Sequence, residues 1–206
     1  MIVHILKLML LFFPLSPTHV FFKIQVNLKK MELNTEPLSR KPTKPTTIYD
    51  AFRHNDVERV DAYIAGGGCL ADADNEGLTF LHHCAAGKQA EPLRKLMEVS
   101  ETRGKQLPVD AKDSSGWTAL HYAADKGSVD IANLLLDEGS NVNAKDEAKR
   151  TPLHLAANGG DAAMVALLIK RGAAKHFLNV AGWTALRYAE EGKHADVVAL
   201  LATESK

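Results

Sequence analysis

The stretch Gly116–Gly127 reads GWTALHYAADKG, and Gly182–Lys193, sixty-six residues further on, reads GWTALRYAEEGK. Halfway between them, at a spacing of thirty-three residues, Lys149–Gly160 reads KRTPLHLAANGG. A fourth copy, Gly77–Lys88, reads GLTFLHHCAAGK and precedes the first stretch by thirty-nine residues. The chain therefore repeats with a period of 33 residues, interrupted by one six-residue insertion. A fixed period of this length predicts stacked structural units, each too small to bury its own apolar face.

Each copy predicts a pair of helices. A threonine begins the first helix, where its hydroxyl can cap free backbone N–H groups, and Pro152 suits the first helical position after Thr151. Small residues recur five positions after the threonine and let neighbouring helices approach closely, and we read Cys84 as one of them, a packing residue. Apolar residues three or four apart predict the second helix. Expected N-caps of these second helices are Asp56, Ser128 and Asp161, and glycines expected to end them are Gly67, Gly139 and Gly172.

The phrases TPLHLAANGG and TALHYAADKG, with ALLIKRGA and ANLLLDEGS after them, resemble the ankyrin repeat. The resemblance covers residues 46–206 and implies an all-α solenoid of helix-turn-helix units joined by β-hairpin fingers. Five units are expected to begin near Thr46, Thr79, Thr118, Thr151 and Thr184. The end units depart from the pattern and are expected to act as caps. Tyr49 and Arg187 replace their histidine, and Glu190 replaces an alanine.

The sequence offers little catalytic chemistry. The family resemblance implies that His82, His121 and His154 hydrogen-bond locally, tying each loop to its helix. His82, His83 and Cys84 form the one His/Cys cluster, but adjacent helical residues point about 100° apart and are poorly placed to share a metal ion. The chain contains no phosphate-binding loop, dinucleotide fingerprint or nucleophile elbow. We therefore expect no enzyme activity, no metal and no cofactor.

The N-terminal part differs in composition from the rest. Residues 1–45 contain seven Lys or Arg and two Asp or Glu, so a net charge of zero divides into +5 there and −5 in the remainder. Residues 1–30 are apolar and basic, and are read either as a poorly ordered leader or as a targeting segment such as a signal peptide. Met31 is an alternative start. Residues 31–45, rich in Pro, Thr and Lys, are expected to form a linker.

Location and redox state follow from the same features. The two cysteines, Cys69 and Cys84, fit a reducing compartment. We expect a cytoplasmic protein. Three dispersed basic residues of the linker are a candidate nuclear-import signal: Arg40, Lys41 and Lys44. Membrane contact is expected only if residues 1–30 act as a targeting segment.

In the ankyrin family the fingers and first helices line a concave face that generally binds proteins. The residue before each threonine lies on this face and forms a set that we call the ladder: Leu78, Trp117, Arg150 and Trp183. Trp and Arg are enriched among interface hot spots. The alternative is that the Trp117 and Trp183 rings pack over their own turns. The ends of the first helices add further candidates: Asp125, Lys126, Asn158 and Glu191.

These features predict a non-catalytic, monomeric adaptor or scaffold with a protein partner. The alternative is an assembly chaperone or inhibitor whose acidic body masks a basic client, because complementary charge speeds encounter. Nucleic-acid binding is not expected, since the repeats contain no basic stripe. The insertion at residues 99–108 is read either as functional or as a neutral expansion.

Overall fold

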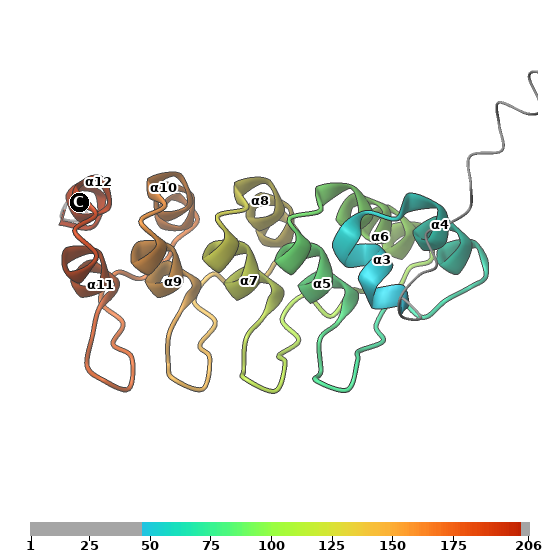
Figure 1. The fold of residues 1–206 in the computed structure, drawn as a ribbon, viewed down its shortest axis with the longest axis horizontal. Coiled ribbons are helices and arrows are strands. Elements are labelled where there is room, and N and C mark those ends of the chain that lie inside the picture. The colour runs from blue at the N-terminus through green and yellow to red at the C-terminus, as the bar shows by residue number, and fades with distance from the viewer. Residues whose placement is uncertain (1–46, 203–206) are drawn as a thin grey trace, which may run out of the picture. The chain divides into compact units, whose positions relative to one another are not determined.

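The computed structural model describes residues 47–202, which form ten α-helices arranged as five hairpins in a row (Figure 1). The predicted leader, the predicted linker and Met31 lie outside the described residues. Within the described range, no helix is both long and apolar enough to cross a bilayer. The hairpins pair α3 (Ile48–His54) with α4 (Val57–Ala65), α5 (Phe80–Gly87) with α6 (Ala90–Thr102), α7 (Ala119–Lys126) with α8 (Val129–Asp137), α9 (Pro152–Gly159) with α10 (Ala162–Lys170), and α11 (Ala185–Glu191) with α12 (Ala195–Ala202).

The hairpins pack into two layers. The first helices form one layer in which α3, α5, α7, α9 and α11 each contact the next, and the second helices form the other. Small residues make the close approach within the first layer possible: Cys84, Ala123, Ala156 and Ala189 are all completely buried. The second layer contributes larger aliphatic side chains, among them Leu135, Met164 and Leu168. The all-α solenoid expected from the repeat is confirmed.

The predicted helix ends are also confirmed, with one correction of register. Asp56, Ser128 and Asp161 occupy N-cap positions, and Gly67, Gly139 and Gly172 have positive φ just after the second helices. In the first unit, however, the N-cap is Thr47 rather than Thr46. The Asp50 carboxylate accepts a hydrogen bond from the Thr47 N–H at 3.0 Å, and this capping box fixes the helix start. Asp50, not Tyr49, therefore stands where the middle units have histidine.

An aromatic cluster joins the first unit to the second. The Phe52 and Phe80 rings are both completely buried, with centroids 4.4 Å apart, and Tyr49 stacks on Phe80 at 5.0 Å. Gly87 lies so close to this unit that a Cβ atom there would meet the Arg53 carbonyl oxygen. Large rings in place of alanine thus fill the space at this end of the stack.

The six-residue insertion is part of the packed structure. It extends α6 to thirteen residues, against nine in α8 and α10, and the following loop places Leu107 in the core at 8% exposure. Arg103 donates hydrogen bonds to the carbonyls of Ile64 and Gly68 in the preceding unit. The insertion therefore lengthens the helix itself as well as the loop, and it ties two units together.

Four loops project from the same side of the stack (Figure 1). We call residues 69–78, 108–117, 141–150 and 174–183 the finger loops. The expected β-hairpins are not confirmed, because the described residues contain no strand and only one isolated antiparallel bridge, between Ala73 and Thr79. Backbone bonds nevertheless join successive loops: Ser114 N–H donates to Glu76, Glu147 to Ser115 and Val180 to Ala148. The loops thus stack on one another as the helices do.

Candidate functional site

Each finger loop is held in shape by one inward-pointing Asp or Asn. Five residues before each threonine stand Asp74, Asp113, Asp146 and Asn179. The Oδ1 atom of Asp113, for example, accepts hydrogen bonds from the Ser115 and Trp117 N–H groups at 2.8 and 2.9 Å. Such a side chain mimics a backbone turn and satisfies N–H groups that would otherwise need water. Sequence reasoning missed these residues, although their recurrence before each threonine was a visible signal.

In three of the four loops, the other polar side-chain atom of the same residue reaches the first helix. Asp113 Oδ2 accepts a hydrogen bond from the Tyr122 hydroxyl at 2.7 Å, and Asn179 Nδ2 donates to the Tyr188 hydroxyl at 2.8 Å. Burial, followed by the Asp113 carboxylate, raises the pKa of Tyr122 above its ordinary value. Asp74 contacts His83 in the same way, so three finger loops are fixed against the helix that follows them, whereas Asp146 Oδ2 of the third loop accepts a hydrogen bond from Arg150 Nε at 2.8 Å.

The three repeated histidines join neighbouring units. In each unit the threonine N–H donates to histidine Nδ1, at 3.0 Å for Thr79 and His82, so Nδ1 is the acceptor and Nε2 carries the proton. Nε2 of His82 then donates to the Trp117 carbonyl at 3.0 Å, and Nε2 of His121 donates to the Arg150 carbonyl at 3.1 Å. Burial lowers the pKa of His82, His121 and His154, which favours the neutral ring. The histidines are structural, and they act between units as well as within them.

The ladder is only partly open to a partner. Leu78 is 6% exposed, so little of its side chain is accessible at this position of the ladder. Trp117, Arg150 and Trp183 are half-buried. The Arg150 guanidinium lies 5.5 Å from the Trp117 ring centroid and forms an ion pair of 2.8 Å with the buried Asp146 carboxylate. The cation is thereby fixed over the ring.

The same stacking recurs at the last unit with a different arginine. The Arg187 guanidinium lies 4.7 Å from the Trp183 ring centroid, and the Trp183 ring also contacts Tyr188 edge-on at 5.2 Å. Trp117 contacts Tyr122 in the same way at 5.0 Å. Each Trp therefore packs on a Tyr of its own unit and carries an Arg. Sequence reasoning did not assign Arg187 to the ladder, since the contact crosses from a loop to a helix.

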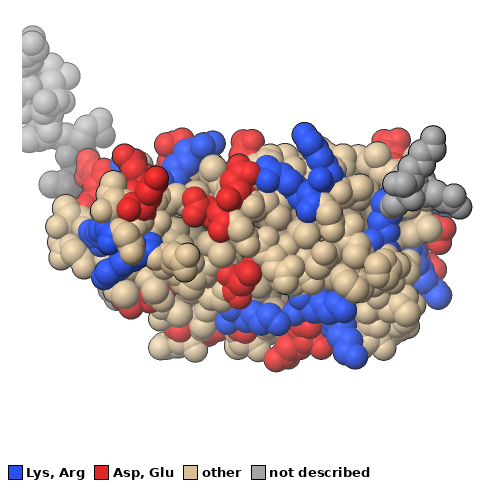
Figure 2. Space-filling view, turned by 180° about the vertical axis from the view of Figure 1, so that it is seen from behind, with Lys and Arg blue, Asp and Glu red and all other residues tan. Residues whose placement is uncertain are grey.

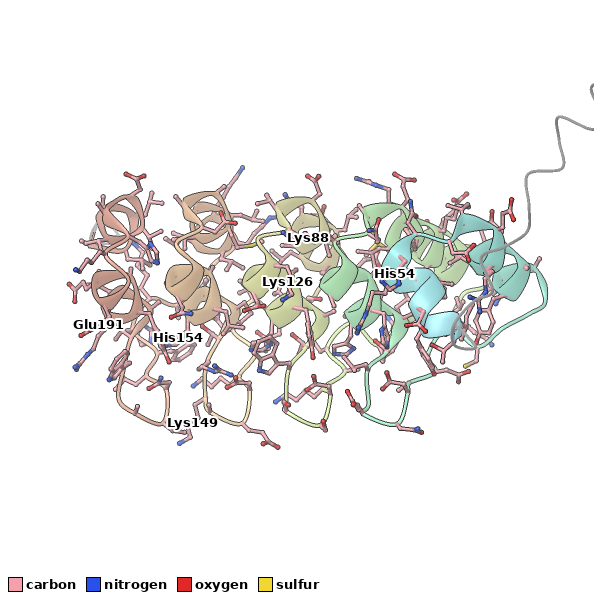
Figure 3. All side chains as sticks on the ribbon, viewed as in Figure 1. His54, Lys88, Lys126, Lys149, His154 and Glu191 are labelled. Atoms are coloured by element: carbon pink, nitrogen blue, oxygen red, sulfur yellow. The ribbon has the colours of Figure 1, made fainter. Side chains whose placement is uncertain are left out.

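One open groove of about 560 Å³ brings half of the predicted residues together. Trp117 and Arg150 from the ladder line it with Asp125 and Lys126 from the end of α7, and Glu147 forms part of its wall. Asp125 and Lys126 form an ion pair of 3.1 Å on the exposed helix end. Figure 3 shows Lys126 on α7, above the finger loops. The groove combines an aromatic ring, cations and carboxylates.

The remaining predicted residues lie outside this groove. Asn158 and Glu191 are exposed at the ends of α9 and α11. The Asn158 carbonyl accepts a hydrogen bond from His194 Nε2 at 3.2 Å, which contributes to the packing of the last unit. Glu191 lies at the opposite end of the layer from α3 (Figure 3).

Residues of the His/Cys cluster are engaged in other contacts. His83 Nε2 lies 2.9 Å from an Asp74 carboxylate oxygen, while the adjacent His82 bonds to the next unit. Burial raises the pKa of the Cys84 thiol, which favours the unreactive protonated form. No group of three or more potential metal ligands occurs in the part of the chain that the structure describes.

The finger edge changes sign along the stack. Finger loops 69–78 and 108–117 contain five Asp or Glu and one Lys, a net charge of −4. Finger loops 141–150 and 174–183 contain four Lys or Arg and two Asp or Glu, a net charge of +2. Seen from behind, basic side chains lie along this edge in the middle and C-terminal parts of the stack (Figure 2). A partner that covers the whole edge therefore meets two different electrostatic environments.

Comparison with known families agrees with the geometry. Residues 48–146 match a model of ankyrin repeats in three copies, and residues 135–189 match a model of ankyrin repeats in many copies. This family is in general a non-catalytic domain for interactions between proteins.

Three curated proteins show partial similarity. Diacylglycerol kinase zeta of Rattus norvegicus is 26% identical over 122 residues, 52% of this chain and 13% of that protein. Ankyrin repeat, SAM and basic leucine zipper domain-containing protein 1 of Carollia perspicillata is 29% identical over 39% of this chain and 20% of its own length. Alpha-latrotoxin-Lg1a of Latrodectus geometricus is 34% identical over 39% of this chain and 6% of its own length. The chain thus spans a fifth or less of each of these relatives.

Proposed function

Because this chain belongs to the ankyrin-repeat family, we propose that its interaction module serves as a non-catalytic adaptor or scaffold. Its partner is a protein, and the surface that recruits it is the groove beside Trp117 together with the exposed part of the ladder. The observation that carries the proposal is the meeting of Trp117, Arg150, Asp125 and Lys126 in one open groove. Trp and Arg are the residues most enriched among binding hot spots, particularly where packing fixes their side chains.

Replacing both ladder tryptophans tests this proposal. Trp117→Ala combined with Trp183→Ala should weaken partner binding by at least about 2 kcal/mol, roughly thirtyfold. The measurement is affinity capture from cells with quantitative mass spectrometry, followed by titration of the captured partner. Val57→Ala, which removes an exposed side chain from α4, is the control and should leave binding unchanged.

The ring contacts with Tyr122 and Tyr188 make a folding control necessary. Circular dichroism and thermal unfolding should show that the double variant keeps its helices. If truncation lowers stability, Trp117→Phe with Trp183→Phe retains an aromatic ring against each Tyr and isolates the contribution of the indole. A folded double variant that captures the same proteins with the same affinity would refute the ladder as the recruiting surface.

The alternative function, a chaperone or inhibitor that masks a basic client, has one observation in its favour. The first two finger loops carry a net charge of −4, which complements a basic partner. Partner affinity measured across a salt series separates the two functions, since charge pairing across an exposed surface weakens steeply with ionic strength. Strong salt dependence favours the basic client, and weak dependence favours docking on the tryptophans.

Location and assembly form part of the same proposal. We propose that the protein is a monomer in the cytoplasm and that the basic residues of the linker direct any import into the nucleus. Sedimentation of the full chain tests the monomer. A reporter fused to residues 1–30, followed by cell fractionation, tests whether that segment directs the protein to a membrane or a secretory route.

A further inference from the structure

The finger loop 174–183 differs from the other three at its tip. In the first three loops, the residues six and four positions before the threonine are small or polar: Ala73 and Asn75, Lys112 and Ser114, Lys145 and Glu147. The fourth loop has Leu178 and Val180 there, 53% and 65% exposed. Among the described residues they are two of only three large apolar side chains with such exposure. Isolated exposed apolar residues are common, but two on one loop mark a candidate contact surface.

The local geometry holds both side chains outward. Asn179 between them is 8% exposed, and its Oδ1 atom accepts hydrogen bonds from the Ala181 and Trp183 N–H groups, both at 2.9 Å. Asn179 is thus held inward by its own turn, while Leu178 and Val180 on either side of it are exposed.

Val180 also has a defined place relative to the groove. Its equivalent one unit earlier is Glu147, which lines the groove beside Trp117. The equivalents of Asp125 and Lys126 are Asn158 and Gly159. At the next position along the stack, an apolar side chain thus replaces a carboxylate, and the Asp125–Lys126 ion pair has no counterpart.

Two cations lie on segments that contact the loop of the apolar pair. The Val180 N–H donates to the Ala148 carbonyl at 3.0 Å, which brings the adjacent Lys149 beside the loop tip, and Figure 3 shows Lys149 at the tip of its own loop. Arg187 lies over the Trp183 ring, at the other end of the same loop. Neither Lys149 nor Arg187 forms an ion pair with a carboxylate among the residues that the structure describes.

We propose that Leu178, Val180, Lys149 and Arg187 bind a protein segment in which Asp or Glu residues flank bulky apolar side chains. This inference rests on the proposed function, that the finger side of the stack binds a protein, and adds the chemical class of the segment. The apolar side chains of the segment cover Leu178 and Val180, and its carboxylates pair with the two cations. A planar anionic membrane fits less well, since the carboxylate of Glu147 is exposed on the same loop tip as Lys149.

Selection from a random peptide library displayed on phage, with the full chain as target, tests this proposal. Selected peptides should be enriched in Asp or Glu beside Leu, Ile or Phe. Val180→Glu with Lys149→Glu should weaken binding of a selected peptide by about tenfold or more, because it removes an apolar contact and reverses one charge. Val57→Glu with Lys170→Glu makes the same exchanges on exposed positions of α4 and α10, and should leave binding unchanged.

Several results would overturn the inference. Selection of basic peptides, failure to select any peptide, or equal binding by the wild type and the Val180/Lys149 variant would each refute it. Binding of phosphatidylserine vesicles that is lost in the same variant would assign the surface to a membrane instead. If the variant does not fold, Val180→Ser with Lys149→Ser replaces it, and the same tenfold loss is expected. If peptide binding depends on Trp117 but not on Val180 and Lys149, the proposed function stands and this inference fails.

Discussion

The three middle units and the two end units of the stack differ at one position, the third residue of the first helix. The middle units have His82, His121 and His154, each of which bonds to a carbonyl of the next unit. In the first unit the Asp50 carboxylate accepts a hydrogen bond from the Thr47 N–H, and in the last unit only the backbone N–H of Arg187 takes part in the cap, by donating to the Thr184 hydroxyl oxygen. One position thus serves local capping in all five units, but links neighbouring units only where it is histidine.

The difference teaches what holds a repeat stack together. A unit needs a cap to form its helix, and Asp or Thr supplies one. Cohesion between units requires in addition a side chain with a donor and an acceptor on opposite sides, which a neutral imidazole provides. At the first junction, the stacked rings of Tyr49, Phe52 and Phe80 take over that role by apolar packing.

The largest expected effect comes from removing the middle histidine. His121→Ala should lower the free energy of unfolding by about 3 kcal/mol, since it leaves the buried Thr118 N–H without a partner, removes the bond to the Arg150 carbonyl of the next unit and opens a cavity. Arg187→Ala at the equivalent position of the end unit should cost less than about 0.5 kcal/mol. Urea unfolding followed by circular dichroism measures both. Equal losses would mean that the bond between units contributes nothing to stability.

Lowering the pH should destabilise the middle units, by less per histidine than the substitution His121→Ala does. The folded state lowers the pKa of the three histidines, so the unfolded chain takes up protons first as the pH falls. The contribution of the neutral histidines to the free energy of unfolding is complete above the unfolded-state pKa of about 6.5 and is lost progressively below it. The urea concentration at the unfolding midpoint should therefore decrease as the pH is lowered from 7 to about 5, a range in which exposed carboxylates still carry charge. His121→Gln should show a shallower fall, and a midpoint constant over this range would contradict the assignment.

The smallest effect concerns reactivity alone. Cys69 is exposed at the edge of the first finger loop, and Cys84 is buried in the second unit. A thiol reagent such as Ellman's reagent should label Cys69 rapidly in the folded protein, and should label Cys84 only when urea opens the stack. Cys69→Ser serves as the control and should leave no rapidly reacting thiol. Rapid labelling of both cysteines would show that the second unit opens far more often than its packing suggests.

Much of the fold could be predicted from the sequence because the residues that define the repeat act on the backbone close to them. Threonine caps, small residues five positions later and glycines after the second helices each act within a few residues of the chain, so their spacing alone locates the helices. The first unit shows the limit of such reasoning. Thr46 and Thr47 are adjacent, and only the capping box with Asp50 decides between them.

The site could be predicted less well because its properties depend on contacts between units. Leu78 and Trp117 occupy equivalent positions, yet Leu78 is buried and Trp117 is half-buried. The pairing of Arg187 with Trp183, and the outward direction of Val180, depend on how each loop folds against its neighbours. No spacing rule within one unit contains this information.

The histidine bonds have a consequence for how the protein can change over time. Each imidazole binds the main-chain carbonyl of a ladder residue, whose side chain is tryptophan in two cases and arginine in the third. The acceptor is the same whatever side chain stands there. Mutations that alter recognition at these places leave that bond intact, so new specificities are open to the stack without loss of its cohesion.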